Sequence, residues 1–438
     1  MEDFLNTLLE QIRCNKAKPF IEEEIRGHIE DQIADSISYG MTKEAAEQAA
    51  IADMGSPVEI GISLDQIHRP QISWGMLALM AMISVAGIVI HSLIGNSIEG
   101  SSSFALYTAV GFTVMIGIYR IDYSVVAKFS RIIAFLFLVV TFMASMGVTG
   151  VMVNGMTFYL NLGGIHVSLF SFMMLYIPLY GSIIYKYHGT GYGGLIKSLI
   201  WMIIPCFIAL RLPSLSLVVI LLVSMATVLS IAIWSDWFLI TKKRVIATIW
   251  GCILGLPIFF LGLAFSVGWI AAYQVDRLRA FITKSGDASY MTTLLRSYLS
   301  NSFFVGNSGN EMVGYLPNLN SNYIVAYVSS TYGIIVGIAV SCILAALIIK
   351  IFSISFKQKN QLGMIMGCGC GIVILINTTL NILENIGFVP PSQTFLPFFS
   401  AGGSGIIVCY ILMGIVLSVY RYKNILPKHV DTKTLHIE

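Results

Sequence analysis

The side chains most able to perform chemistry lie in one segment, residues 271–322. It carries the acids Asp276, Asp287 and Glu311, together with four bases and several aromatic residues. A carboxylate can accept a proton near neutral pH and so serve as a general base. We therefore expect any catalytic chemistry in this segment, with Glu311 as the best candidate base. The alternative is a flexible connector whose acids are simply solvated.

Cysteine and histidine give no sign of metal or disulfide chemistry. Six of the seven cysteines lie in apolar runs, and the chain has no C-x-x-C pair. Cys368 and Cys370 are two residues apart, so on a helix they would not share a face. The seven histidines are scattered without the spacing of metal ligands. We expect no zinc site, no disulfide framework and no resident cofactor.

Composition places these residues in a membrane protein. Apolar residues make up 56% of the 438 residues and charged residues 11%, whereas soluble domains carry about 25% charged residues. Residues 1–70 hold 14 of the 23 acids and 6 of the 26 bases, so the remainder of the chain is basic. This asymmetry predicts two domains. No basic face interleaved with stacking aromatics is present, so we expect no nucleic-acid partner.

Ten segments are long and apolar enough to cross a bilayer. If the N-terminus is cytoplasmic, fifteen of the twenty bases after residue 70 fall in predicted inner segments and five in outer ones. This bias agrees with the positive-inside rule, and it places residues 271–322 outside, between spans seven and eight. The predicted fold is an all-α polytopic membrane protein with both termini cytoplasmic. Its spans are 72–94, 103–119, 130–150, 167–185, 195–212, 215–234, 245–270, 323–352, 363–384 and 403–420.

The acidic N-terminal part, residues 1–70, reads as a small helical domain. Isoleucines at a three-to-four-residue period predict a helix over 18–39 that stops at Gly40. Thr42 can cap a helix over 43–54, and Ser56-Pro57-Val58-Glu59 forms a capping box for a third helix. The segment resembles the "permease prefix" domain of Gram-positive bacteria through its G-M-T-x-E-A-A and M-G-S-P elements. The resemblance implies a cytoplasmic interaction or regulatory module; a passive solubilising cap is the alternative.

The stretch 381–404 reads NILENIGFVPPSQTFLPFFSAGGS and resembles the signature of the SEDS family, the FtsW/RodA/SpoVE proteins of cell-wall synthesis. The resemblance extends over residues 71–421 and implies the ten-span layout. It divides the chain into a prefix domain (1–70), a membrane domain (71–425) and a cytoplasmic tail (426–438). The matching signature residues are Asn381, Ile382, Gly387, Pro390, Leu396, Pro397, Phe398, Ser400, Gly402, Gly403 and Ser404.

This resemblance implies a peptidoglycan glycosyltransferase of the bacterial plasma membrane. Such enzymes polymerise lipid II with a class B penicillin-binding protein in elongation, division or sporulation. Arg277 can bind the diphosphate of that lipid, or it can simply sit at the head groups of the surrounding membrane lipids. A divalent cation accompanying the diphosphate is the one cofactor allowed. The remaining implied substrate-binding positions are Asn307, Ser308, Pro317, Pro397, Ser400, Gly402, Gly403 and Ser404; the prolines and glycines among them also suit a structural role.

The sequence departs from the family where chemistry is expected. The family's catalytic acid aligns with Asn322, and a carboxamide cannot accept a proton. The charges of the family's Q-P-S-E-x-x-K motif are absent from residues 168–174. Glu384, near the outer end of the ninth span, is predicted to line a cavity or to reach the interface. Two hypotheses therefore stand together: a glycosyltransferase rescued by Glu311, or a degenerate paralogue that binds a lipid-linked precursor or acts as a scaffold. A lipid flippase is a weaker third.

Overall fold

The N-terminal domain is a group of four helices in the computed structural model, which describes residues 1–94, 101–153, 156–212, 214–266, 290–307, 320–390, 392 and 394–425. The helices are α1 (Glu2–Glu10), α2 (Lys18–Ser38), α3 (Lys43–Met54) and α4 (Pro57–His68). The three predicted helices are present, with Thr42 and Ser56 capping α3 and α4. Helix α1 was not predicted, and it supplies Leu5 and Leu8 to a core shared with α2.

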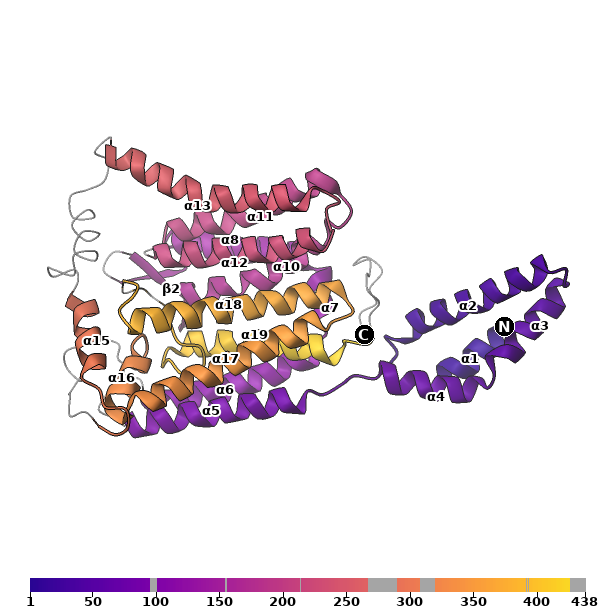
Figure 1. Ribbon diagram of the computed structural model, residues 1–438, viewed down its shortest axis with the longest axis horizontal. Coiled ribbons are helices and arrows are strands. Elements are labelled where there is room, and N and C mark those ends of the chain that lie inside the picture. The colour runs from indigo at the N-terminus through magenta and orange to yellow at the C-terminus, as the bar shows by residue number, and fades with distance from the viewer. Residues whose placement is uncertain are drawn as a thin grey trace.

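This domain projects from one end of the helical bundle, which we call the prefix end (Figure 1). Lys16 forms an ion pair with Asp122, and its ammonium group donates to Ser124 Oγ at 2.7 Å. The backbone N–H of Gln71 donates to the carbonyl of Arg421 at 3.0 Å. The side chain of Ile425, from the other end of the chain, is buried in the core of the N-terminal domain. Polar and apolar contacts therefore join the two parts.

The membrane domain begins with α5 (Trp74–Ile94), and its helices run along a common direction (Figure 1). Every one of the ten predicted spans overlaps a helix of the described residues. Within the described ranges, seven helices are long and apolar enough to cross a membrane: α5, α6 (Ser101–Arg120), α11 (Gly191–Leu210), α12 (Leu215–Trp234), α17 (Ile334–Phe356), α18 (Gln361–Asn385) and α19 (Gly403–Arg421). The other three predicted spans fall on α8 (Ser130–Ser145), on the pair α9 (Leu169–Met174) and α10 (Tyr176–Tyr185), and on α13 (Lys242–Ser266). The count of ten spans stays a prediction.

Three details differ from the sequence prediction. The predicted spans 130–150 and 167–185 overrun their helices, because residues 150–168 form an antiparallel sheet of β1 (Gly150–Val153), β2 (Met156–Leu162) and β3 (Ile165–Ser168). The predicted span 323–352 is divided at Gly333, whose φ of 105° ends α16 (Ile324–Tyr332) before α17 begins. Short helices α7 (Tyr123–Lys128) and α15 (Tyr290–Ser300) lie outside the predicted spans.

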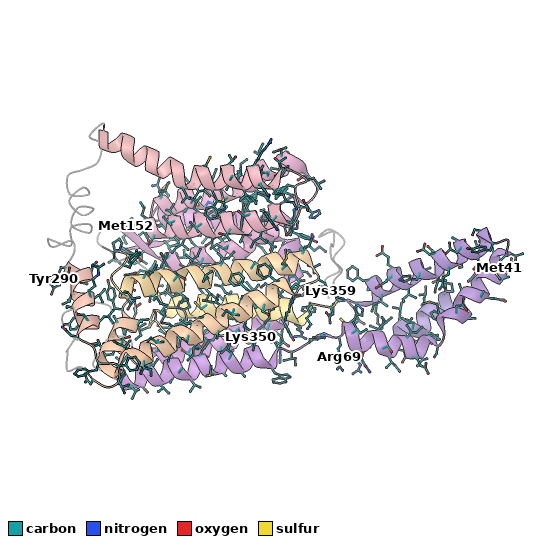
Figure 2. The ribbon with its side chains drawn as sticks, viewed as in Figure 1. Met41, Arg69, Met152, Tyr290, Lys350 and Lys359 are labelled. Carbon is teal, nitrogen blue, oxygen red and sulfur yellow. The ribbon has the colours of Figure 1, made fainter. Side chains whose placement is uncertain are left out.

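The interior of the bundle is built around α18 and α19. Helix α18 is buried along most of its length and packs against α10, α12, α17 and α19. Helix α6 lies along α19, and close approach depends on Gly111, since a Cβ there would overlap the ring of Tyr410. Figure 2 places Met152 and Tyr290 at the end of the bundle opposite Lys359 and the N-terminal domain. We call this opposite end the sheet end.

Candidate functional site

A cavity of about 860 Å³ lies between the small sheet, α9 and the beginning of α19. Strands β2 and β3 supply one wall, including His166, and α19 supplies Ile407 and Ile411. Ser321 and Asn322 line another side. The lining combines hydroxyl, amide and imidazole groups near the sheet with aliphatic side chains along the helices. A cavity of this kind suits a ligand that has a polar part and a long apolar part.

None of the described residues that line the cavity is Asp, Glu, Lys or Arg. The positions at 168–174, where sequence analysis found charged residues missing, supply Ser168, Phe170 and Ser171 to the lining. The imidazole of His166, an exposed side chain on β3, can accept a proton in its neutral form. Sequence analysis missed this group because β3 was expected to be part of a loop and a helix.

Asn322 is held at the cavity by both its backbone and its side chain. Its carbonyl accepts hydrogen bonds from the side-chain amides of Asn381 and Asn385, each at 2.9 Å. Its own amide, Nδ2, donates to the carbonyl oxygen of Ser392 at 3.2 Å. The three asparagines thus connect the segment before α16 to the end of α18, and the side-chain amide of Asn322 is oriented by a backbone carbonyl.

Glu384 organises the segment that faces Asn322. Its carboxylate accepts hydrogen bonds from the backbone N–H of Ser392 at 2.9 Å, from the Ser392 hydroxyl at 2.8 Å and from the Thr394 hydroxyl at 2.7 Å. The side chain is 1% exposed and does not line the cavity. Neither role predicted for Glu384 is therefore correct. These hydrogen bonds satisfy the buried carboxylate, which would otherwise be costly to bury. They also hold in place the residue Ser392, whose carbonyl accepts a hydrogen bond from the Asn322 amide.

The segment 395–405 forms a compact turn that places several candidate residues beside the cavity. Ser400 Oγ donates to the carbonyl of Ser321 at 2.5 Å and accepts the N–H of Leu396 at 2.7 Å. Gly403 lies against Tyr107, leaving no room for a Cβ, and Ser404 Oγ accepts the N–H of Ser168 at 3.0 Å. The turn therefore ties the start of α19 to both the sheet and the Asn322 segment.

The candidate residues fall into three groups. Asn322, Gly402, Gly403 and Ser404 line the cavity together. Ser400 and Pro397 belong to the turn beneath it, and Asn307 lies after α15, outside the cavity lining. Arg277, Ser308, Glu311 and Pro317 lie outside the described residues, as do Asp276 and Asp287.

Comparison with known proteins decides the family. A family model described as "Cell cycle protein", which represents FtsW, RodA and SpoVE, matches residues 68–425. The chain belongs to the FtsW/RodA/SpoVE family. The match covers all of the residues that line the cavity, so the cavity is part of the family's membrane domain in this protein.

Two curated relatives of this FtsW/RodA/SpoVE protein carry the name "Probable peptidoglycan glycosyltransferase FtsW". That of Enterococcus hirae is 29% identical over 36% of this chain and 39% of its own length, so the match spans well under half of that relative. That of Aliivibrio salmonicida is 23% identical over 80% of this chain and 88% of its own. A solved structure described as "Structural coordination of polymerization and crosslinking by a peptidoglycan synthase complex" has a TM-score of 0.67 and 15% identity, over 80% of this chain and 98% of that one. It confirms the predicted fold class.

Proposed function

We propose that this protein is a cell-wall assembly protein of the peptidoglycan glycosyltransferase type, acting on lipid II at the cavity beside Asn322. The cavity itself carries the proposal, because its polar rim and aliphatic wall match a sugar diphosphate joined to a polyprenyl chain. Membership of the FtsW/RodA/SpoVE family and relatives named as peptidoglycan glycosyltransferases support the same conclusion. In this reaction a sugar hydroxyl attacks the anomeric carbon of the donor lipid, and the diphosphate departs.

Sugar transfer requires a group that takes the proton of the attacking hydroxyl. Asn322 stands where the family has its acid, and its carboxamide can only orient the hydroxyl by hydrogen bonds. We take two groups as the candidates for this base: Glu311, the preferred acid of the segment predicted to face outside, and His166 on the cavity wall. In the enzymatic form of the proposal, one of these two groups is the base, and Arg277 binds the departing diphosphate.

A second function, binding of a lipid-linked precursor without polymerisation, is favoured by the contact of Asn322 with Ser392. The Asn322 amide donates to a carbonyl that Glu384 holds in place. A carboxylate at position 322 would present an oxygen to that carbonyl and would lose the hydrogen bond. The surroundings of position 322 therefore suit an amide better than a carboxylate. This is expected of a paralogue that binds the precursor and has no need of a base at this position.

Polymerisation of labelled lipid II by the purified full chain separates the two functions. Glycan strands formed by the wild type and reduced at least 100-fold in Glu311→Gln or His166→Asn would establish the enzyme and its base. Asp276→Asn and Asp287→Asn are matched controls for Glu311, and they should keep activity. Retention of lipid II without chain growth would establish the binding protein. Flipping of lipid II across liposomes without chain growth, or no binding at all, would contradict both.

We infer that a class B penicillin-binding protein is the partner and that both termini are cytoplasmic. The first inference rests on the family and on the likeness in fold to a peptidoglycan synthase complex. The second rests on the distribution of bases along the chain. An impermeant thiol reagent should label a cysteine placed at Ser36 in the N-terminal domain only after the cells are opened, and labelling of intact cells would contradict the orientation.

A further inference from the structure

Three cationic side chains converge at the prefix end of the bundle, where α8, α10 and α11 pack against one another. Arg131 lies in the first turn of α8, Lys186 follows α10, and Lys197 lies in the second turn of α11. The guanidinium of Arg131 and the ammonium of Lys197 both lie over the ring of Tyr187, at 5.0 and 6.0 Å from its centre. The Tyr187 hydroxyl is fixed by the indole N–H of Trp201 at 3.1 Å. We call Arg131, Lys186 and Lys197 the basic cluster.

The protein supplies no carboxylate to the basic cluster within its described residues. The described part of the membrane domain contains three acids, Asp122, Asp236 and Glu384. Asp122 pairs with Lys16, and Asp236 pairs with Lys242 at 2.6 Å. Glu384 is occupied by Ser392 and Thr394. Arg131 and Lys197 share the ring of Tyr187, and Arg131 also repels Lys186. Without an anionic partner in the described part of the chain, these positive charges call for a ligand of opposite sign.

Lys186 shows most clearly that the cluster is electrostatically unbalanced. Its ammonium donates to the carbonyl of Lys128, the last residue of α7, at 2.7 Å. Burial lowers the pKa of Lys186, and repulsion from Arg131 lowers it further. A neutral carbonyl dipole is a weak counterpart for two adjacent cations, so an anion bound here would relieve their repulsion.

Apolar side chains lead from the cluster into the membrane. On α8, Arg131 starts an exposed helical stripe that continues through Phe135, Val139 and Phe142. On α11, Lys197 starts a second stripe through Ile200, Ile204 and Phe207. Because α8 and α11 pack against each other, the two stripes belong to neighbouring helices (Figure 1). A charged head beneath exposed aliphatic and aromatic side chains is the pattern that an anionic lipid requires.

We propose that the basic cluster binds the phosphate head group of an anionic phospholipid of the leaflet at the prefix end, with its acyl chains along the stripes of α8 and α11. The head group accepts hydrogen bonds from Arg131, Lys186 and Lys197, and Tyr187 keeps Arg131 and Lys197 in place. The site is separate from the cavity at the sheet end and shares no residue with it. It therefore stands independently of the proposed glycosyltransferase function.

Native mass spectrometry of the purified full chain tests this proposal. The probes are dioleoyl-phosphatidylglycerol, dioleoyl-phosphatidylcholine, which has no net charge, and glycerol 3-phosphate, which has a phosphate but no acyl chains. The wild type should prefer phosphatidylglycerol to phosphatidylcholine. Each of Arg131→Gln and Lys197→Gln should reduce that preference about fivefold, and the double variant about 25-fold, on the scale expected for single bases near an anionic surface.

The matched control removes two positive charges from the same end of the bundle. Lys357→Gln/Lys359→Gln alters exposed lysines between α17 and α18, and Figure 2 shows Lys359 at the prefix end. This control should change the lipid preference less than twofold. Equal losses in both double variants would overturn the proposal, because binding would then follow total charge. Displacement of phosphatidylglycerol by glycerol 3-phosphate alone would also overturn it, since the ligand would then be a free phosphate.

Discussion

Replacing Asn322 by Asp tests whether this site is built around an amide. In the wild type, Nδ2 of Asn322 donates to the Ser392 carbonyl at 3.2 Å, and Glu384 holds the Ser392 segment by three hydrogen bonds. Asn322→Asp removes the donor and places a negatively charged oxygen near the carbonyl oxygen. Leaving a partly buried polar group without its partner costs about 1–3 kcal/mol. We expect Asn322→Asp to lower the melting temperature by a few degrees at pH 7.5.

The stability of Asn322→Asp should depend on pH, and the direction of this dependence follows from the hydrogen bond to Ser392. A protonated carboxyl group at position 322 would again donate to the Ser392 carbonyl, so the folded state favours the proton and raises the pKa of that carboxyl group above its ordinary value of about 3.9. The stability that protonation restores is complete below that ordinary value and is lost as the pH rises through the raised pKa. The difference in stability between the wild type and Asn322→Asp should therefore become smaller as the pH is lowered.

A thiol-reactive fluorophore can follow unfolding, because Cys206, Cys368, Cys370 and Cys409 are buried and free. Asn322→Ala is the control, because it removes the hydrogen-bond donor without adding a charge. Its loss of stability relative to the wild type should not become smaller as the pH is lowered. At pH 7.5 the expected order of melting temperatures is wild type, Asn322→Ala, Asn322→Asp. An Asn322→Asp variant as stable as the wild type at pH 7.5 would refute the reasoning, and the argument for a precursor-binding paralogue would fail with it. If Asn322→Asp alone switches on glycan synthesis, the wild type is a paralogue that has lost its catalytic base, and this outcome would support the precursor-binding function.

Two further predictions concern the scaffold. Lys16→Gln leaves Asp122 without its cation in a contact where both side chains are 11% exposed, so the N-terminal domain should dock more weakly, by up to about 3–5 kcal/mol. Hydrogen exchange at residues 421–425 should accelerate in Lys16→Gln and not in the control Lys18→Gln, and unchanged exchange would show that the ion pair does not hold the domain. Gly111→Ala should destabilise the α6–α19 contact by about 1–3 kcal/mol because its Cβ meets the Tyr410 ring. Gly117→Ala, on the same helix with open space around it, should leave the melting temperature unchanged, and equal behaviour of the two variants would contradict the packing argument.

Local sequence determined the helices of this protein. The hydrophobic effect acts on any segment of about twenty apolar residues, so the membrane helices could be placed without knowing their neighbours. Likewise, Thr42 and Ser56 cap α3 and α4 through hydrogen bonds that span only three residues. The family signature, too, is contiguous in the chain, so residues 400–404 could be identified before their contacts were known.

Only the tertiary structure decided what surrounds Asn322. Its partners lie about 60 and 70 residues away, on α18 and at Ser392, and no local periodicity reports such contacts. The same holds for Glu384, whose hydrogen-bond partners in a folded turn make it an anchor of that turn, and for His166, which a short sheet brings to the cavity wall. Apolar patterns determine which segments become helices because burial is nearly non-directional. Hydrogen bonds are directional, so the polar site is determined only when distant segments fold together.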